Sequence, residues 1–396
     1  MRIALTHTRL ARRGGIEGYL YRLAGSLLER GEEVHYFAAT GEPLDHPRFF
    51  FHRVRALPGP PFLKVWCFDR SVQQALREGD FDVVHGFTKT SRQDVYTDGS
   101  GCQADFEQIS LPLRGPVRRA IRRWGPHRYA VARLEALRYR RGRFRRVIAM
   151  SKMASEQIRR RHGLSESEVE VLYNGVDLDE FSPGRRETEG VEMRRRFAPD
   201  DVLLVLFVGN DGSRKGADIL LNGMQRIGPV RAKALIAGRV SSERDLLSLA
   251  RSLGVEVELL GPREDISCLL AAADLLVFPS RFDIFGMSVL EAMASGIPVV
   301  VSRSAGASEI VTHGKDGWVI GTEDCGGVAE GIRRLADPVL RRSMGKEARR
   351  TAEGYSIDRH TDRLIEIYRE VAEEKRRATS LRSRSLESTT SRLSRN

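Results

Sequence analysis

Cysteine is scarce in this chain, with four cysteines among 396 residues and no Cys-x-x-Cys pair. This scarcity excludes a small disulfide-stapled domain and the short cysteine spacings of common zinc sites. Cys67, Cys102, Cys268 and Cys325 lie far apart in the sequence. We therefore expect reduced thiols in a cytosolic protein, not disulfide partners or zinc ligands.

Long apolar runs are also absent, since no run approaches the roughly 20 residues needed to span a bilayer. The first strand-like segment, residues 2–6, is too short for the apolar core of a signal peptide. The hydrophobic content of 41% still supports packed cores, and 396 residues suit two domains of ordinary size. These features predict a soluble, cytoplasmic protein.

Lysine is missing and acids are nearly missing from one arginine-rich segment. Residues 114–146 contain thirteen arginines and a single acid, Glu135, so this segment carries a net charge equal to the +12 of the whole chain. Residues 375–396 are also basic and lack apolar periodicity, which predicts a disordered tail. A concentrated basic patch implies an anionic partner.

Part of this segment has the pattern of an amphipathic helix, because Val117, Ile121 and Trp124 share one helical face. Four arginines occupy the other faces: Arg118, Arg119, Arg122 and Arg123. Such a helix can lie on an anionic membrane surface, where each basic residue contributes about 1 kcal/mol. A core-facing helix with a charged outer face is the alternative. No nucleic-acid recognition motif is present, so no nucleic-acid partner is expected.

Short apolar strands alternate with helices along the chain, which predicts parallel, doubly wound sheets. The first half has strands at 3–6, 34–38, 81–84 and 147–150, and a helix over 19–29. The second half restarts with strands at 202–208, 233–237, 257–260, 275–278 and 299–301, and helices over 242–253 and 266–272. Two Rossmann-like halves in tandem are the simplest architecture.

The segment 279–301 carries the strongest functional signal. Gly286 opens a short helix whose unpaired N–H groups can hold an anion, Gly296 ends it, and Pro298 prevents its continuation. Two carboxylates, Asp283 and Glu291, flank the helix start eight residues apart. An anion site beside two hydroxyl-binding carboxylates suits a nucleotide sugar. A strand–helix–strand unit with incidental acids is the alternative.

This window resembles the carboxylate-x7-carboxylate signature of retaining GT-B glycosyltransferases of family 4, also called glycosyltransferase group 1. The family usually has Glu at the first position, where this chain has Asp283. The resemblance implies an α/β chain with two Rossmann-like, doubly wound domains that face each other across a cleft. It also implies transfer with retention of configuration and without a metal or other cofactor.

The resemblance assigns roles around the donor. Glu291 is expected to accept hydrogen bonds from ribose hydroxyls, and Asp283 to accept one from a hydroxyl of the donor sugar. The remaining donor-binding positions are Gly14 and Gly15 beside the diphosphate, Arg263 near the nucleobase, and the backbone N–H groups of Phe285, Gly286 and Met287. The glycines lie at the carboxyl end of the first strand, where doubly wound sheets bind ligands.

Arg214 and Lys215 follow the strand at 202–208 and precede a helix. Two cations at this place can neutralise the diphosphate that leaves during transfer, so no metal is needed. The surrounding sequence resembles the Gly-x-Asp-x-Gly-Arg-Lys-Gly pattern of lipopolysaccharide core glucosyltransferases, although Asn210 stands where the wider family has arginine. A solvated surface pair is the common alternative for adjacent Arg and Lys.

On the acceptor side, Asp98 lies in a glycine-rich loop and is expected to contact the acceptor hydroxyl. The stretch from Asp94 to Cys102 also resembles the lipopolysaccharide core subgroup. His85 follows a buried strand, where a histidine is more often a structural group than a catalytic one.

These features predict a cytoplasmic transferase on the inner face of the cytoplasmic membrane, moving a hexose from a nucleotide sugar to a glycan or glycolipid acceptor. UDP-glucose and a lipopolysaccharide inner core are the preferred substrates. The alternatives are a GDP-mannose enzyme acting on a lipid-linked or capsular acceptor, and a non-catalytic polyanion-binding scaffold. The expected units are an acceptor domain at 1–172, a donor domain at 173–354, a helix crossing back at 355–374 and a disordered tail at 375–396.

Overall fold

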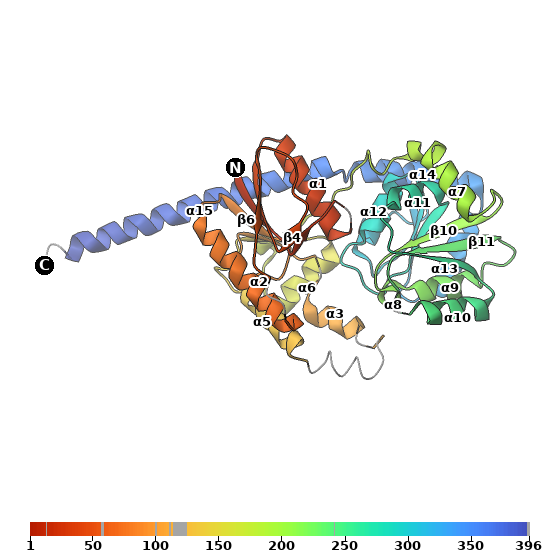
Figure 1. Ribbon diagram of the computed structural model, residues 1–396, viewed down its shortest axis with the longest axis horizontal. Coiled ribbons are helices and arrows are strands. Elements are labelled where there is room, and N and C mark those ends of the chain that lie inside the picture. Colours follow the sequence, from red (N-terminus) through yellow and green to blue (C-terminus); the bar gives the residue numbers. More distant parts are fainter. Residues whose placement is uncertain are drawn as a thin grey trace.

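The computed structural model describes residues 1–12, 14–56, 59–99, 101–110, 112–113, 125–240 and 242–393, with the backbone alone from residue 382 onward. Two lobes lie side by side in Figure 1, one built from the first half of the chain and one from the second. Each lobe contains one large parallel sheet with helices around it.

The first sheet has seven parallel strands in the order β5-β3-β1-β6-β7-β8-β9. Its strands are β1 (Arg2–Thr6), β3 (Glu33–Ala38), β5 (Phe49–Arg53), β6 (Val83–Gly86), β7 (Val95–Thr97), β8 (Arg146–Ala149) and β9 (Val169–Val171). A small parallel pair, β2 (Arg9–Leu10) and β4 (Thr40–Gly41), lies beside it. The helices of this half are α1 (Ile16–Glu29), α2 (Pro61–Ala75), η1 (Leu76–Glu78), α3 (Gln103–Ser110), α5 (Pro126–Arg138), α6 (Lys152–His162) and η2 (Glu166–Glu168).

Helices cover both faces of the first sheet. Successive residues of a strand point to opposite faces, so the side chains of β1 contact helices on both sides. Ile3 and Leu5 of β1 pack in one cluster with buried side chains of α1 and of the last helix, α15 (Ile357–Leu393). Ala4 packs in another cluster with Phe68 and Val72 of α2. A strand that is buried on both faces is apolar at consecutive positions, which is the pattern that Ile3, Ala4 and Leu5 of β1 show.

The second sheet has six parallel strands in the order β12-β11-β10-β13-β14-β15. Its strands are β10 (Leu203–Val208), β11 (Ala232–Ala237), β12 (Glu256–Gly261), β13 (Leu275–Phe278), β14 (Val299–Ser302) and β15 (Gly317–Ile320). Its helices are η3 (Pro183–Glu187), α7 (Glu189–Phe197), α8 (Gly212–Lys215), α9 (Ala217–Met224), α10 (Glu243–Leu253), α11 (Ile266–Ala272), α12 (Met287–Ala294), η4 (Gly306–Ile310), α13 (Cys325–Leu335) and α14 (Pro338–Glu353). The predicted doubly wound architecture is therefore confirmed in both halves.

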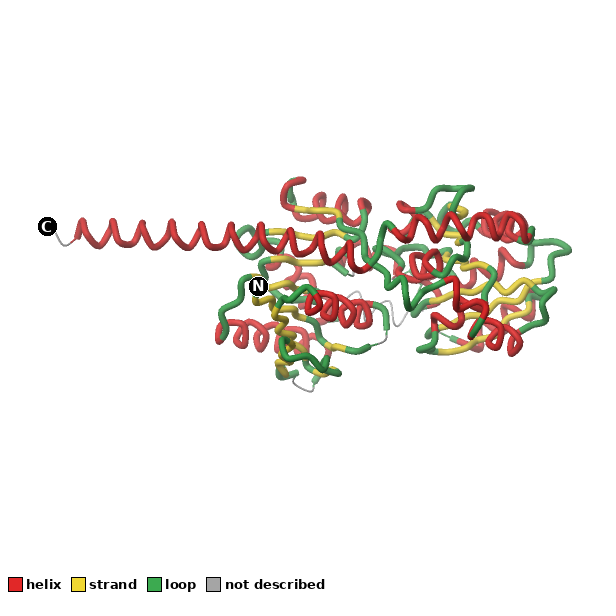
Figure 2. Tube along the Cα trace, turned by 90° about the horizontal axis from the view of Figure 1, so that it is seen from above, coloured by secondary structure: helices red, strands yellow, loops and turns green. Residues whose placement is uncertain are grey.

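The last helix, α15 (Ile357–Leu393), starts beside the second half and returns across the first (Figure 2). Its apolar residues Leu364, Ile367 and Val371 join the cluster under β1 and α1. His360 hydrogen-bonds Tyr19 of α1 at 2.6 Å between Nε2 and the hydroxyl. The predicted crossing helix is thus present and docked on the first sheet.

The disorder predicted for the tail is wrong for residues 375–393, because α15 continues without interruption to Leu393. Lys375 still contacts the first half, where its Nζ donates to the Phe81 carbonyl at 2.8 Å. The sequence after it contains neither glycine nor proline, so nothing in the chain stops a helix that is already nucleated by docking. The low apolar content removes packing partners but does not end the helix.

His85 is a structural group. Its ring nitrogens lie 2.6 Å from the Tyr368 hydroxyl of α15 and 2.8 Å from the Thr97 hydroxyl, and its side chain is fully buried. Burial lowers the pKa of this imidazole well below its usual value, so the ring is neutral. It joins α15 to the first sheet.

The two halves meet along a seam in which the second half caps a helix of the first. Glu309 accepts from the backbone N–H groups of Lys152 and Met153, at 2.7 and 2.9 Å, at the start of α6. A carboxylate at a helix N-terminus is stabilising, since it meets unpaired N–H groups and the positive end of the helix dipole. Ser151 donates from Oγ to the Ile284 carbonyl at 2.8 Å. The loop before α12 is therefore fixed against the first half.

Candidate functional site: a carboxylate held by two cations at the switch point of the second sheet

The strand order of the second sheet reverses between β10 and β13, which lie next to each other. Ligands of doubly wound sheets bind at this kind of switch point, outside the carboxyl ends of the strands. The loop after β10 leads into α8, which carries Arg214 and Lys215. The loop after β13 carries Asp283 and leads to α12. The topology thus brings together residues about 70 positions apart in the sequence.

Asp283 lies between the two cations. Its Oδ2 accepts from Lys215 Nζ and lies 3.3 Å from Nη1 of Arg214, which also donates to the Phe282 carbonyl at 2.6 Å. Burial alone would raise the pKa of Asp283, but Lys215 and Arg214 hold it below its ordinary value. Burial lowers the pKa of Lys215, against the opposing effect of Asp283. The predicted trio therefore forms one charged cluster with a net positive charge.

Gly286 ends the loop and caps α12 in the left-handed region, with φ of +98°. An added Cβ would lie 2.9 Å from the Phe278 ring, so both the backbone conformation and the space require glycine. The N–H of Phe285 already donates to Asp283 Oδ1 at 3.2 Å. Of the three N–H groups predicted to bind the donor, those of Gly286 and Met287 are thus the better placed at the helix start.

Glu291 lies in the second turn of α12 and is partly buried. In the described part of the chain its carboxylate makes no hydrogen bond or ion pair, unlike that of Asp283. Burial raises its pKa to about 7, and the nearest charges are those of Arg22 and Glu180, which pair with each other at 3.1 Å. Arg22 belongs to α1, so Glu291 faces the first half of the molecule.

The predicted glycine turn lies at the start of α1, whose N-cap is Gly15. Gly14 has φ of +112°, and no atom of the described residues would lie within 4 Å of a Cβ added at Gly15, so these residues leave the turn open to a ligand. The loop after β7 contacts both the start of α1 and the second half of the molecule. A Cβ at Gly99 would lie 3.6 Å from Ile16, and one at Gly101 would lie 2.5 Å from Ile284.

Asp98 directly follows β7, but its side chain is 2% exposed. Its Oδ2 accepts from the Tyr139 hydroxyl at 3.0 Å, in a buried group that includes Arg138 and Tyr96. In this arrangement the buried carboxylate ties the loop after β7 to Tyr139 at the end of α5. Its predicted contact with the acceptor stays a prediction.

Arg263 follows Gly261 at the end of β12 and is exposed. Its Nε donates to Asp265 at 2.8 Å and its Nη2 donates to the other oxygen of the same carboxylate. These hydrogen bonds raise the pKa of the guanidinium and leave the Nη1 N–H groups for other acceptors. The structure does not place it in contact with the Asp283 cluster, so its predicted role near the nucleobase stays a prediction.

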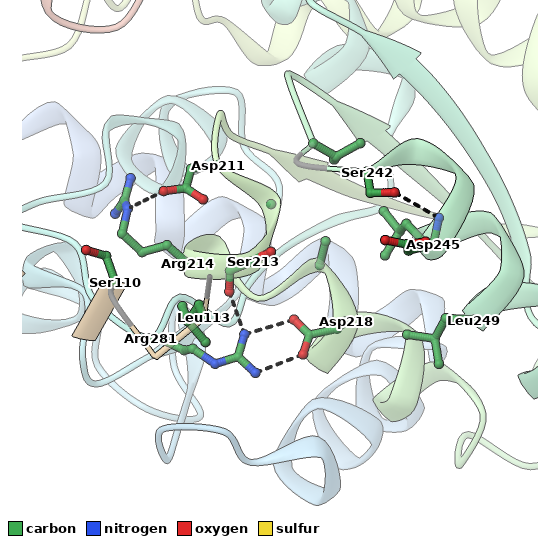
Figure 3. A pocket seen from close by; sticks show the side chains of 14 residues that line it. Ser110, Leu113, Asp211, Ser213, Arg214, Asp218, Ser242, Asp245, Leu249 and Arg281 are labelled. Carbon is green, nitrogen blue, oxygen red and sulfur yellow. Dashed lines mark hydrogen bonds and ion pairs between the residues drawn. The ribbon is translucent and has the colours of Figure 1, made fainter. Parts of the chain in front are cut away.

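Arg281 is the residue that sequence analysis passed over. Both of its Nη atoms donate to Asp218, at 2.9 and 2.8 Å (Figure 3). Its Nε donates to Glu323 at 2.6 Å. It therefore ties the loop after β13 to the start of α9 and to the loop after β15. The available signal is its position in the sequence, two residues before Asp283 in the loop that follows β13.

A cavity of about 470 Å³ lies beside Arg214, between α8, α10 and the end of α3 (Figure 3). Asp211, which lines it, has φ of 68°, a conformation that is strained for a residue other than glycine. Its Oδ2 lies 3.5 Å from Arg214 Nε. Ser110 of the first half also lines this cavity, so both lobes contribute to it.

The sequence matches two family models. The model described as "Glycosyl transferase 4-like domain" matches residues 14–175, and the one described as "Glycosyl transferases group 1" matches residues 203–337. The chain belongs to the group 1 glycosyltransferases of the GT-B fold.

Three solved structures share the fold across nearly the whole chain. WaaG, a glycosyltransferase involved in lipopolysaccharide biosynthesis, superposes with a TM-score of 0.77 at 22% identity, covering 92% of this chain and 99% of WaaG. The sucrose-phosphate synthase of Thermosynechococcus elongatus gives 0.74 at 20% identity, covering 93% of this chain and 98% of that one. Anabaena HepE in complex with UDP and glucose gives 0.69 at 22% identity, with coverages of 93% and 99%.

Curated relatives are more similar in sequence over a shorter stretch. An uncharacterized glycosyltransferase of Methanocaldococcus jannaschii is 33% identical over 231 residues, which cover 56% of this chain and 59% of the relative. A D-inositol 3-phosphate glycosyltransferase of Thermobifida fusca is 32% identical over 241 residues, covering 57% of this chain and 55% of the relative. The chain thus spans between half and two thirds of the length of these group 1 relatives.

The predicted membrane patch, Arg118, Arg119, Arg122, Arg123 and Trp124, lies outside the described residues. Within the described ranges, no helix combines the length and the apolar character that crossing a bilayer requires.

Proposed function

We propose that this group 1 glycosyltransferase transfers a hexose from a nucleotide sugar, with UDP-glucose as the donor, and retains the anomeric configuration. The observation that carries the proposal is the Asp283 carboxylate between Lys215 and Arg214, at the start of α12 and at the switch point of the second sheet. The HepE structures with UDP and with UDP-glucose support a uridine nucleotide in this fold.

In this proposal the diphosphate lies at the two cations and the start of α12. An ammonium group has three N–H donors, so Lys215 can bind Asp283 and still donate to a phosphate oxygen. As the sugar–phosphate bond breaks, negative charge grows on the leaving diphosphate, and fixed cations and backbone N–H groups stabilise it. The chemistry proposed for this site needs no metal ion. Asp283, held by its partners, would accept from a hydroxyl of the donor sugar.

Two acceptors are compatible with the comparisons. A lipopolysaccharide inner core is favoured by the fold shared with WaaG, and a small phosphorylated polyol is favoured by the D-inositol 3-phosphate relatives. Transfer assays with each acceptor and labelled UDP-glucose would distinguish them. A GDP-mannose enzyme would instead transfer label from that donor to a lipid-linked acceptor.

Nucleotide binding tests the proposal directly. Thermal unfolding is measured with UDP, GDP and ADP, each with and without EDTA, for the wild type and for Lys215→Ala. Stabilisation by UDP alone that persists in EDTA and disappears in the variant is the expected result, since a ligand that binds only the folded state raises its stability. Stabilisation by GDP alone would indicate a GDP-sugar as the donor in place of UDP-glucose. The absence of any nucleotide effect would contradict the enzyme and favour a non-catalytic, polyanion-binding scaffold.

Glu291 predicts a pH dependence of donor binding. Its pKa of about 7 means that the carboxyl is protonated below neutral pH, and only the carboxylate accepts from both ribose hydroxyls. UDP affinity should therefore fall about tenfold from pH 8 to pH 6, since protonation removes the binding form. Calorimetric titration of UDP at several pH values measures this change.

The phosphates of UDP titrate in the same range, so Glu291→Gln is the necessary comparison. This variant keeps the phosphate contribution and should lose the additional dependence, with affinity at pH 8 lowered about tenfold for one hydrogen bond to a charged group. Glu330→Gln, at an exposed ion-paired position on α13, should behave like the wild type. Equal pH profiles for Glu291→Gln and the wild type would remove Glu291 from the donor site.

We propose peripheral attachment to the inner face of the cytoplasmic membrane because of the concentrated positive charge at residues 114–146. Replacing Arg118, Arg119, Arg122 and Arg123 by Glu should abolish flotation with vesicles that contain anionic lipid, because each basic residue contributes about 1 kcal/mol near such a surface. Hydrolysis of soluble UDP-glucose should be unchanged. Vesicle binding equal to that of the wild type would show that these arginines do not attach the protein.

A further inference from the structure

Three potential metal ligands converge at the end of the loop between β7 and α3. Cys102 ends this loop directly before α3, Glu135 lies on α5, and His162 is the last residue of α6. One ligand atom from each of them lies within 4.8 Å of the other two. The sequence separates these residues by 33 and 27 positions, so the fold alone brings them together.

The separations match those of ligands around a tetrahedral zinc ion. The Cys102 sulfur lies 3.8 Å from His162 Nε2, and that nitrogen lies 3.2 Å from a carboxylate oxygen of Glu135. Zinc bonds of about 2.3 Å to sulfur and about 2.0 Å to nitrogen and oxygen, at tetrahedral angles, place these pairs roughly 3.6 and 3.3 Å apart. Both observed distances lie close to these values.

The contacts exclude the arrangement of a cysteine–histidine–carboxylate catalytic triad. In a triad the nucleophile and the carboxylate bind opposite nitrogens of the imidazole. Here the Cys102 sulfur and the Glu135 oxygen both face Nε2. The sulfur is also fully buried, where no substrate carbonyl can reach it. Three ligand atoms directed at one another are the pattern of a metal site.

Neighbouring groups hold these ligands in place. The second oxygen of Glu135 accepts from the backbone N–H of Gln103 at 2.9 Å. The His162 ring stacks on Tyr139 with centroids 3.9 Å apart. The side chains of Glu135 and His162 are 15% and 14% exposed, so an ion can reach the site and keep a water as its fourth ligand. Groups that orient the ligands are a regular feature of metal sites.

We propose that Cys102, Glu135 and His162 form a zinc site. A thiolate and an imidazole favour Zn²⁺ over Mg²⁺ and Ca²⁺, which prefer oxygen ligands. This site differs from the donor site, whose chemistry needs no metal, and it contradicts the expectation that the cysteines are free thiols only. The ion would pin the loop of Asp98 and Gly101, which touches Ile284, to α5 and α6.

Cobalt is the first probe, because Co²⁺ adopts the same tetrahedral site and shows its ligands by absorption. The full chain is stripped with chelator and titrated with Co²⁺ and then with Zn²⁺. One equivalent of Co²⁺ should produce a thiolate-to-cobalt charge-transfer band together with the intense visible bands of tetrahedral cobalt, and Zn²⁺ should displace it. The absence of the charge-transfer band in the folded wild type would overturn the proposal without any variant.

Variants then locate the ligands. Cys102→Ser, His162→Gln and Glu135→Gln should each lower zinc affinity by more than about 10- to 100-fold, the typical effect of changing a group that only supports a ligand. Cys268→Ser is the matched control, because it removes a partly buried thiol of the second half and should leave one bound zinc. His162→Gln keeps the buried thiol, so it tests the ligand assignment even if Cys102→Ser does not fold. Wild-type zinc affinity in Cys102→Ser and in His162→Gln would overturn the assignment.

Discussion

Lys215→Ala is expected to lower kcat about 10²- to 10³-fold, the range found when one fixed donor to a developing negative charge is removed. Lys215 is the cation that shares Asp283 with Arg214, and its partly buried Nζ lies 4.5 Å from the centre of the Phe278 ring. Water that replaces it cannot supply an oriented positive charge in this place. The release of UDP from UDP-glucose, followed at saturating donor, measures the loss.

The fold should survive this change. Asp283 keeps Arg214 at 3.3 Å and the N–H of Phe285 at 3.2 Å, so its charge stays compensated. The loss of stability should therefore stay below the roughly 3–5 kcal/mol seen when a buried charge loses its only partner. Far-ultraviolet circular dichroism and thermal unfolding check this separately from turnover.

A second lysine provides the matched control. Lys233 on β11 is also partly buried, and its Nζ donates to the Phe197 carbonyl at 2.9 Å and pairs with Glu258 at 2.8 Å. Lys233→Ala removes the same charge from the same half of the molecule, on β11 and not at the switch point between β10 and β13, so it should lower stability and leave kcat within about twofold. Equal kcat losses in both variants would mean that charge at residue 215 has no special part in the reaction.

Much of the fold follows from sequence because the buried parallel strands are short, apolar and bounded by turn residues. The helix at 266–272 and the strand at 275–278 agree with α11 and β13 residue by residue. Asp283 and Glu291 were identified from their spacing around a glycine-capped helix, and Arg214 and Lys215 from a charged pair after a strand. These signals are local, so they do not depend on how the halves assemble.

Features that depend on tertiary contacts were not predictable in this way. The burial of Asp98 involves a hydrogen bond from Tyr139, 41 residues later in the chain. The proposed zinc ligands come from three segments that are separate in the sequence. The length of α15 depends on its docking to the first half. Glu309 of the second half caps the start of α6 in the first half, and the sequence around Glu309 gives no sign of this contact. In each case the partner lies far along the chain, and composition alone cannot place it.

Gly216→Ala is expected to be a strongly destabilising small substitution at the site. Gly216 follows Lys215, has φ of +83°, and its added Cβ would lie 2.2 Å from the Pro279 carbonyl oxygen. Backbone strain in the left-handed region costs about 1–3 kcal/mol, and forcing an atom into packed backbone costs about as much again. A loss of about 2–6 kcal/mol should follow, with a fall in melting temperature of at least roughly 4 °C.

Gly228→Ala separates the two causes. Gly228 has nearly the same conformation, φ of +73°, but an added Cβ there meets no atom within 4 Å. It should therefore show only the strain, about 1–2 kcal/mol. Turnover should fall in Gly216→Ala alone, because relief of the clash must move β13's loop or α8, and with them Asp283 or Lys215. Equal melting temperatures for the two variants would show that the loop after β13 yields to the new methyl group, and that the charged cluster is not held by close packing at Gly216.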